Sequence, residues 1–244
     1  MPRAILFDLF ETLITESRDP PRGVSSLAPE FGCAREAFRA QWKTRRPEVT
    51  AGRLSFRQAL SDIVIALGGH ADEAMLQRIC DDRVRAKARA FAQIDCDVVM
   101  MIDYLRSQGL RLAIISNCFA EDVVAWPQSS LASRFDCTLF SFGVGLAKPD
   151  PAIYLEATRR LGVSASDTWF IGDGQDDELL DAERAGLRSF QALWFLKRWS
   201  HFRAPPSSAS TLFRVEELLP LVEQSLAPVD GEFTRASLTE EHDG

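Results

Sequence analysis

The sequence predicts an α/β protein built on a doubly wound parallel sheet with an inserted block of helices. Three observations predict this class. The chain opens with a short apolar segment, residues 25–90 then show helical patterns without a convincing strand, and beyond residue 95 short apolar segments alternate with amphipathic helices. Strands that alternate with helices are typical of a parallel sheet covered on both faces.

Residues 4–7 are all apolar and are followed directly by Asp8, which predicts a short buried strand that ends at a carboxylate. A carboxylate is costly to bury unless it is paired or bound to a metal ion. In open parallel sheets, ligands bind at the carboxyl ends of the strands. Asp8 is therefore a candidate site residue.

The segment after this strand indicates a linker followed by helices. Residues 14–24 are polar and contain prolines, as is typical of a linker. Apolar residues at helical spacing then predict three helices, and Ser55 with Gln58 has the form of a capping box at the start of the second. The predicted helices span residues 34–43, 56–67 and 72–90.

Beyond residue 95 the predicted elements form the rest of the sheet. The predicted strands span residues 110–115, 137–142, 168–171, 187–194 and 210–213. Helices are predicted at residues 97–109, 120–125, 151–161 and 215–225, with another that ends at residue 185. We therefore expect a core formed by residues 1–14 and 96–227, and a helical cap formed by residues 15–95. Residues 228–244 are polar and acidic, which predicts a disordered tail.

Composition narrows the class of function. The 244 residues are 46% hydrophobic and carry a formal net charge of −7, which argues against a nucleic-acid-binding surface. The five cysteines are scattered and form no C-x-x-C pair, so we expect neither a disulfide framework nor a zinc site, and we expect a cytoplasmic protein. The first apolar segment is interrupted at Asp8, so we do not expect it to be a signal peptide. No apolar run is long enough to cross a membrane, so we expect no membrane-spanning segment.

Polar residues follow four of the predicted strands at the point where each strand ends. They are Asp8 with Thr12, Ser116 with Asn117, Lys148, and Asp173 with Asp177. Taken singly, each has a structural interpretation, such as a helix cap for Ser116 or a solvated surface position for Lys148. Because the carboxyl ends of parallel strands meet at one edge of a sheet, we expect these side chains to gather there.

Together these residues are suited to phosphoryl transfer. Asp8 would attack phosphorus as a carboxylate nucleophile and form an acyl-phosphate. The hydroxyls of Thr12 and Ser116 would hold phosphate oxygens, and Lys148 would neutralise negative charge. Asp173 would bind Mg²⁺, a cation that proteins commonly hold through one or two carboxylates, with Asp177 as a further ligand.

The same residues carry a resemblance to the haloacid dehalogenase-like (HAD) hydrolase superfamily. Four stretches resemble its four motifs in order, and the likeness covers about residues 4–220. They are residues 7–13 (Phe-Asp-Leu-Phe-Glu-Thr-Leu), 114–117 (Ile-Ile-Ser-Asn), 148–151 (Lys-Pro-Asp-Pro), and 171–173 (Ile-Gly-Asp) through Ala185-Gly186. The resemblance implies a Rossmann-like core whose helical first-type cap closes over the site and sets substrate choice.

The chain departs from the phosphatase pattern at Phe10, where a second aspartate usually protonates the leaving group. A general acid contributes roughly 10²–10⁴ in rate, so its loss matters. Phe10 would still offer its main-chain carbonyl to the metal and its ring to the substrate or the cap. Glu11 is an alternative acid.

The dehalogenase branch also lacks the second aspartate and needs no metal. That branch usually has an uncharged residue in place of Asp173 and a cap arginine directly after a tryptophan, whereas here Lys43 follows Trp42. The acids after the fourth strand would repel a carboxylate substrate unless a cation is present, and this favours the Mg²⁺ interpretation. Further candidate substrate contacts in the cap are Lys43, Arg45, Arg46 and Arg53.

The sequence thus predicts Mg²⁺-dependent hydrolysis of a small phosphate ester or anhydride through an aspartyl-phosphate on Asp8. Ser116, Asn117, Lys148 and Phe10 are the predicted substrate contacts, and Asp8, Phe10, Asp173 and Asp177 the predicted metal ligands. Asp177 is preferred over Glu178 because it is shorter. Two alternatives remain: a metal-independent 2-haloacid dehalogenase working through an aspartyl ester, and a catalytically weak ligand- or protein-binding member. A small-molecule partner is expected, with no nucleic acid or membrane, in a monomer or homodimer.

Overall fold

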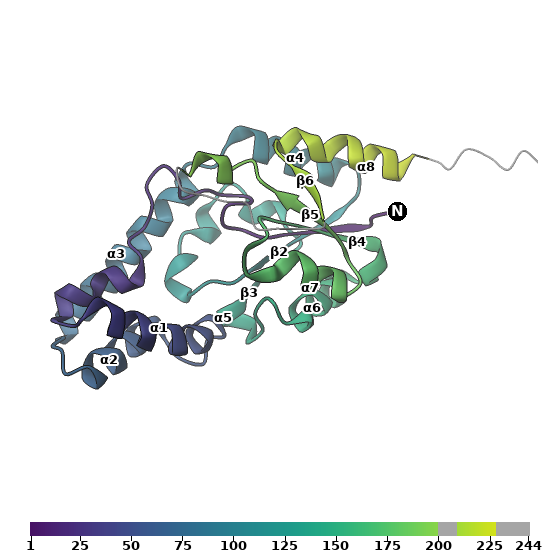
Figure 1. The fold of residues 1–244 in the computed structure, drawn as a ribbon. Coiled ribbons are helices and arrows are strands. Elements are labelled where there is room, and N and C mark those ends of the chain that lie inside the picture. Colours follow the sequence, from purple (N-terminus) through teal and green to yellow (C-terminus); the bar gives the residue numbers. More distant parts are fainter. Residues whose placement is uncertain (200–208, 228–244) are drawn as a thin grey trace, which may run out of the picture.

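A six-stranded parallel sheet with the strand order β3-β2-β1-β4-β5-β6 forms the centre of the computed structural model, which describes residues 1–199 and 209–227 (Figure 1). The strands are β1 (Ala4–Phe7), β2 (Arg111–Ser116), β3 (Cys137–Phe140), β4 (Thr168–Gly172), β5 (Arg188–Ala192) and β6 (Ser210–Leu212). The strand order reverses direction between β1 and β4, which is where doubly wound sheets bind their ligands. The predicted fold class is confirmed.

Strand β1 is central because it pairs with β2 on one side and β4 on the other. Its four residues are fully buried and alternate between the two faces of the sheet. Ile5 and Phe7 pack in one apolar cluster, while Ala4 and Leu6 pack in another. The backbone N–H of Asp8 donates to the carbonyl of Ile171 at 2.9 Å, so Asp8 stands level with the end of β4.

Helices cover both faces of the sheet. Figure 1 shows α4 (Cys96–Ser107) and α8 (Leu218–Leu226) above the sheet, and α6 (Pro151–Leu161) and α7 (Glu178–Arg184) below it. A short helix, α5 (Ser141–Val144), follows β3 directly. The predicted third strand was therefore too long, and the predicted helix at residues 120–125 is only a 3₁₀ turn, Ala120–Asp122.

A second helical layer lies beyond the carboxyl ends of the strands, opposite the amino terminus (Figure 1). It contains the 3₁₀ helix η1 (Val24–Phe31) and helices α1 (Arg35–Thr50), α2 (Phe56–Ala66) and α3 (Glu73–Ala92). The hydroxyl of Ser55 caps α2 by accepting the N–H of Gln58 at 3.1 Å. Helix α1 continues seven residues past its predicted end at residue 43. Pro47 lies in its last turns and does not break the helix.

The helical layer has its own apolar cluster, which is joined by one aromatic side chain from the sheet domain. Phe119 follows β2, and its ring lies 5.7 Å from that of Trp42 and 5.8 Å from that of Phe56. Within the described residues, no helix is both long and apolar enough to cross a membrane. The predicted tail at residues 228–244 lies outside the described residues.

Candidate active site

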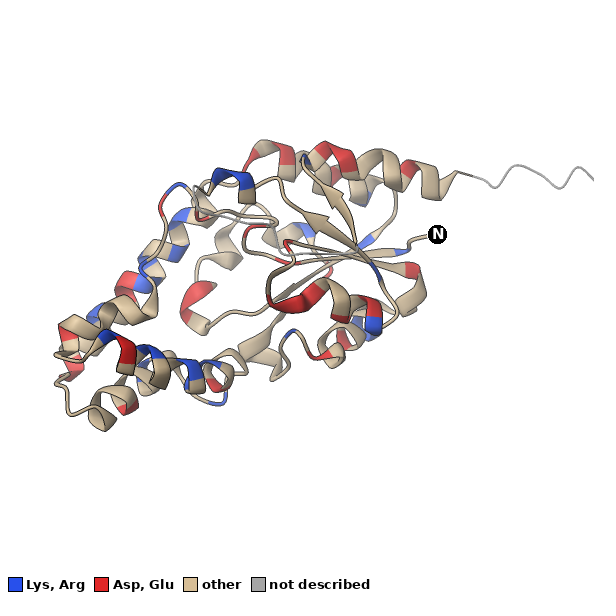
Figure 2. Ribbon diagram, in the orientation of Figure 1, with Lys and Arg blue, Asp and Glu red and all other residues tan. Residues whose placement is uncertain are grey.

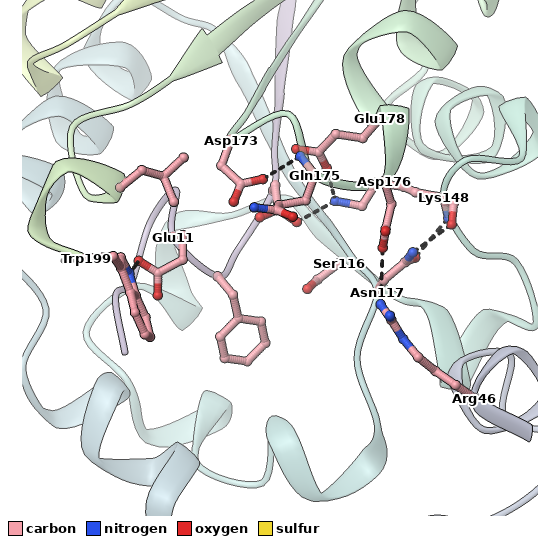
Figure 3. A pocket seen from close by; sticks show the side chains of 13 residues that line it. Glu11, Arg46, Ser116, Asn117, Lys148, Asp173, Gln175, Asp176, Glu178 and Trp199 are labelled. Carbon is pink, nitrogen blue, oxygen red and sulfur yellow. Dashed lines mark hydrogen bonds and ion pairs between the residues drawn. The ribbon is translucent and has the colours of Figure 1, made fainter. Parts of the chain in front are cut away.

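A cavity of about 450 Å³ opens at the carboxyl ends of β1, β2 and β4, beside the helical layer (Figure 3). The sequence-predicted residues on its wall are Asp8, Phe10, Ser116, Asn117, Lys148 and Asp173. The parallel sheet therefore brings together residues that are up to 165 positions apart, from Asp8 to Asp173. Thr12 and Asp177 are not on this wall.

The side chain of Lys148 forms ion pairs with the carboxylates of both Asp8 and Glu178. Burial lowers the pKa of Lys148, but the charges of Asp8 and Glu178 outweigh burial and hold that pKa above its ordinary value. Burial raises the pKa of the Asp8 carboxyl from 3.8 to about 7, although the Lys148 ammonium opposes this change. Lys148 thus remains a cation and fixes the position of the proposed nucleophile.

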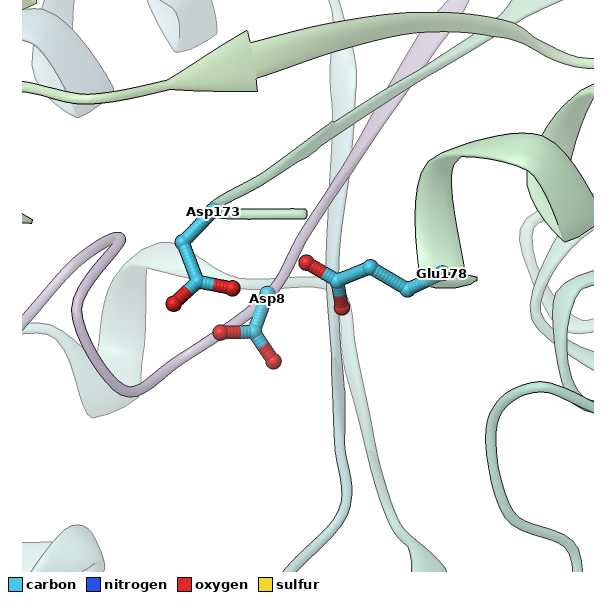
Figure 4. Close-up of side chains that lie close together, drawn as sticks. All are labelled: Asp8, Asp173 and Glu178. Atoms are coloured by element: carbon cyan, nitrogen blue, oxygen red, sulfur yellow. The ribbon is translucent and has the colours of Figure 1, made fainter. Parts of the chain in front are cut away.

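Three buried carboxylates converge at this point (Figure 4). Oxygens of Asp8, Asp173 and Glu178 lie within 4.8 Å of one another. Burial, together with the charges of Glu178 and Asp8, raises the pKa of Asp173 to about 9. Three carboxylates face one ammonium, so the fully ionised cluster has an excess of negative charge. A divalent cation would remove this repulsion, and an all-oxygen donor set suits Mg²⁺.

The structure corrects the choice of Asp177 over Glu178 as the last acid of this cluster. Asp176 and Asp177 have left-handed backbones, with φ of 52° and 60°, and both side chains are exposed. Glu178 is the first residue of α7, is 2% exposed, and accepts the N–H of Gly174 at 3.0 Å. The turn before α7 thus directs the longer acid back into the site.

Gly172 makes room for that glutamate. A Cβ atom at position 172 would lie 2.3 Å from Oε1 of Glu178, closer than any real contact allows. The glycine before Asp173 therefore allows Glu178 to reach the cluster. This is a structural reason for the Gly172-Asp173 pair that sequence spacing alone did not supply.

The two predicted hydroxyl contacts have different surroundings. Ser116 lines the cavity, is 1% exposed, and its Oγ has no hydrogen-bond partner among the described residues. That hydroxyl is free to bind a substrate oxygen. Thr12 is also buried, and its Oγ1 likewise has no hydrogen-bond partner among the described residues. It lies off the cavity wall, and its main-chain carbonyl accepts the indole N–H of Trp194 at 2.8 Å. The predicted contact of the Thr12 hydroxyl with a phosphate oxygen stays a prediction.

Asn117 is a positioning residue in this structure. Its Nδ2 donates to the Lys148 carbonyl at 2.7 Å, and its Oδ1 accepts the Lys148 N–H at 2.8 Å. Both ends of the amide are thus committed to the backbone of Lys148. The side chain of Asn117 therefore holds the lysine loop against the end of β2, and its predicted contact with substrate stays a prediction.

Phe10 lies on the cavity wall and also contacts the helical layer. Its ring centroid is 6.4 Å from that of Phe91 in α3, and the ammonium of Lys87 lies 4.2 Å from the Phe10 ring centroid. The side chain therefore packs against the helices, as one interpretation of the sequence expected. Main-chain coordination of a metal by Phe10 stays a prediction.

Both carboxylate oxygens of Glu11 accept hydrogen bonds from neighbouring groups. Its Oε2 accepts hydrogen bonds from the hydroxyl of Thr15 and the indole N–H of Trp199, both at 2.8 Å, and its Oε1 accepts the N–H of Glu16 at 2.8 Å. The carboxylate therefore holds the loop and the cavity wall in place. This arrangement disfavours Glu11 as a substitute acid.

One cation of the helical layer reaches the cavity. Arg46 in α1 forms an ion pair with Asp176 at 3.1 Å, and both side chains line the wall. Figure 3 shows this ion pair, and Figure 2 shows several basic positions along α1. By contrast, Arg45 bonds to Gln41, and Arg53 bonds to Glu48. Of the predicted cap cations, Arg46 is thus the one on the wall of this cavity.

Sequence reasoning missed the far wall of the cavity, which is formed by Leu196 and Trp199. Both follow β5, in a segment dense in large side chains (residues 194–199). The run of large side chains directly after a strand is the sequence feature that could have revealed this wall. A strand-end segment in a parallel sheet is placed to line the ligand site.

The fold and site define a doubly wound α/β protein with an acidic strand-end site beneath a helical layer. A model of the haloacid dehalogenase-like hydrolase family matches residues 2–186, and the chain belongs to this family. The protein is therefore a hydrolase.

Individual relatives fall into both branches of the family. The chain is 32% identical over 200 residues to a phosphoglycolate phosphatase of Xanthomonas campestris pv. campestris, covering 79% of this chain and 84% of the relative. It is 27% identical over 181 residues to (S)-2-haloacid dehalogenase 4A of Burkholderia cepacia, covering 72% and 76%. A solved 2-haloacid dehalogenase from Pseudomonas syringae pv. Tomato shares the fold, with a TM-score of 0.64, 24% identity, and coverage of 92% of this chain and all of that one.

Proposed function

We propose that the protein is a Mg²⁺-dependent phosphatase that hydrolyses a small phosphate ester or anhydride through an aspartyl-phosphate on Asp8. The observation that carries this proposal is the buried cluster of Asp8, Asp173 and Glu178. A buried group of like charges is stable only when it is neutralised by protons or by a cation. The oxygen ligands present here are those that Mg²⁺ prefers.

The residues on the wall have distinct roles in the proposed reaction. A carboxylate oxygen of Asp8 attacks phosphorus while Lys148 offsets negative charge on both partners. The unpaired hydroxyl of Ser116 donates a hydrogen bond to a phosphate oxygen. Asp173 and Glu178 would hold Mg²⁺ together with Asp8. When bound, Mg²⁺ supplies positive charge that reduces the repulsion between the nucleophile and the phosphate.

Metal-independent dehalogenation is the second candidate function. Phe10 favours it, because departure of a halide needs no general acid. The similarity to (S)-2-haloacid dehalogenase 4A points the same way. Against it stands the acidic cluster, since Asp173 and Glu178 beside Asp8 would repel the carboxylate of a haloacid. The phosphoglycolate phosphatase relative supports the first candidate.

A single assay separates the two candidates. The purified protein is incubated with an aryl phosphate and with 2-chloropropionate, each in Mg²⁺ and in EDTA. We expect phosphate release in Mg²⁺ that EDTA and the variant Asp8→Asn both abolish. Halide release that is insensitive to EDTA would establish dehalogenation. If neither substrate is turned over, and Asp8→Asn matches the wild type across a broad panel of phosphates, the proposed activity is wrong.

A further inference from the structure

We infer that the substrate's leaving group is an aromatic ring bound through a weakly basic oxygen, so that the substrate is an aryl phosphate. This inference rests on the proposed phosphatase function. Two separate features of the site support it. One is an apolar wall opposite the phosphate-binding side chains, and the other is that no acid among the described residues is free to protonate the leaving oxygen.

The cavity has chemically different sides. Figure 3 shows Glu11 and Trp199 on one side, and Ser116, Asn117 and Lys148 on the other. The apolar residues that line the cavity are Phe10, Leu196 and Trp199. Leu196 lies beside Trp199, because its carbonyl accepts the Trp199 N–H at 3.0 Å, and Phe10 directly precedes Glu11 in the chain. A phosphate bound by Ser116 and Lys148 would thus place an ester group of ring size towards an apolar surface. The volume of about 450 Å³ is within the range of small-molecule sites.

The tryptophan on this wall is held in a fixed orientation. The indole N–H of Trp199 donates to Oε2 of Glu11 at 2.8 Å. Glu11 is held in turn by the N–H of Glu16 and the hydroxyl of Thr15, both at 2.8 Å. An aromatic surface that is ordered before binding loses little entropy when a ring packs against it. Aromatic pairs are also more favourable than their buried area alone predicts.

Among the described residues, the same wall has no acid that is free to give a proton to a departing oxygen. Position 10 has a phenyl ring, and both carboxylate oxygens of Glu11 accept hydrogen bonds. Lys148 is paired with Asp8 and Glu178 on the opposite side. A leaving group that departs as a stable anion needs no such proton, whereas an alkoxide does.

The proposed steps balance without a general acid. A carboxylate oxygen of Asp8 forms a bond to phosphorus, and the bond between phosphorus and the aryl oxygen breaks. The electron pair leaves on the phenolate, which takes a proton from water after release. A second water molecule then hydrolyses the aspartyl-phosphate, giving inorganic phosphate and the free Asp8 carboxylate.

The test compares three classes of phosphate in excess Mg²⁺: substituted phenyl phosphates, alkyl phosphates and acetyl phosphate. Acetyl phosphate has a good leaving group but no ring, so it separates leaving-group reactivity from ring recognition. We expect kcat/KM to fall steeply as the leaving group becomes more basic. We also expect the phenyl phosphates to have a lower KM than acetyl phosphate.

Variants then assign the ring contact to the wall. Trp199→Ala should raise KM for phenyl phosphates by about three- to tenfold and leave KM for acetyl phosphate unchanged. Trp199→Phe keeps a ring and should lie closer to wild type, which guards against misfolding of the alanine variant. Phe213→Ala is the matched control, because that aromatic residue is 57% exposed and is not on the cavity wall.

The outcomes distinguish this inference from the proposed function. If alkyl phosphates are hydrolysed as efficiently as phenyl phosphates, or Trp199→Ala affects acetyl phosphate equally, the aryl specificity is wrong while the phosphatase function stands. If none of the three classes releases phosphate in Mg²⁺, the proposed function itself fails.

Discussion

The acidic cluster predicts that the stability of the metal-free protein falls as pH rises. The pKa of Asp8 is raised from 3.8 to about 7, and that of Asp173 from 3.8 to about 9. Between pH 3.8 and about pH 9 the folded protein therefore binds more protons than the unfolded chain does. Stability from these groups is therefore fully present below pH 3.8 and is lost as pH rises through about 7 and then about 9.

The expected magnitude follows from the size of the shift. One pKa unit corresponds to about 1.4 kcal/mol, so the change in the pKa of Asp8 alone represents about 4 kcal/mol of folding stability. For a chain of this length that corresponds to about 10 °C in Tm. Because Mg²⁺ competes with protons for the carboxylates, its stabilising effect should be several-fold larger at pH 8 than at pH 5.

Thermal unfolding followed by circular dichroism checks this prediction, in EDTA and in Mg²⁺ at several pH values between 5 and 9. Asp173→Asn is the control, because it removes one charge from the cluster at nearly constant volume. We expect this variant to lose the part of the pH dependence that comes from Asp173, between about pH 7 and pH 9, and to lose most of the response to Mg²⁺. Equal gains from Mg²⁺ at pH 5 and pH 8 in the wild type would refute the reasoning, as would the same pH profile in wild type and variant.

Four other substitutions test separate parts of the site. Gly172→Ala should displace Glu178 and weaken Mg²⁺ binding by about 10- to 100-fold, measured by calorimetry, and unchanged affinity would contradict the steric argument. Ser116→Ala should lower kcat/KM for phosphate esters by about tenfold or more with little loss of Tm, because the hydroxyl has no partner within the described structure. Arg46→Gln breaks an exposed ion pair and should change the free energy of unfolding by less than about 1 kcal/mol in urea titrations, so a larger loss would show that the pair is structurally important. Phe10→Asp should raise turnover of alkyl phosphates relative to aryl phosphates, and a fall in that ratio would mean that position 10 serves other chemistry.

The sequence was sufficient for the features that depend on regular periodicity. The buried β1 strand and the alternation beyond residue 95 predicted the sheet, and the sheet then placed Asp8, Ser116, Lys148 and Asp173 on one cavity. A parallel sheet converts positions at successive strand ends into neighbours, so no knowledge of side-chain contacts was needed for that step.

The features that the sequence did not predict depend on local backbone geometry or on contacts between residues far apart in the chain. Nothing in the residues Asp176-Asp177-Glu178 reveals that the first two adopt left-handed backbones and that the third turns inward. The bond between Glu11 and Trp199 joins residues 188 positions apart. Contacts of that kind arise from how loops meet across the sheet, which periodicity does not describe.

Position 10 links the chemistry of the site to the attachment of the helical layer. The Phe10 ring contacts the Phe91 ring and lies beneath the Lys87 ammonium, which is itself paired with Glu16 at 2.8 Å. Burial raises the pKa of Glu16, so this ion pair already lies in a poorly solvated place. An aspartate at position 10 would bring a second carboxylate to Lys87 and remove the aromatic contact with α3. The phenylalanine therefore stabilises the junction between the helices and the sheet at the position where an acid would otherwise protonate the leaving group. A single side chain thus accounts both for this packing and for the restriction to weakly basic leaving groups that we propose.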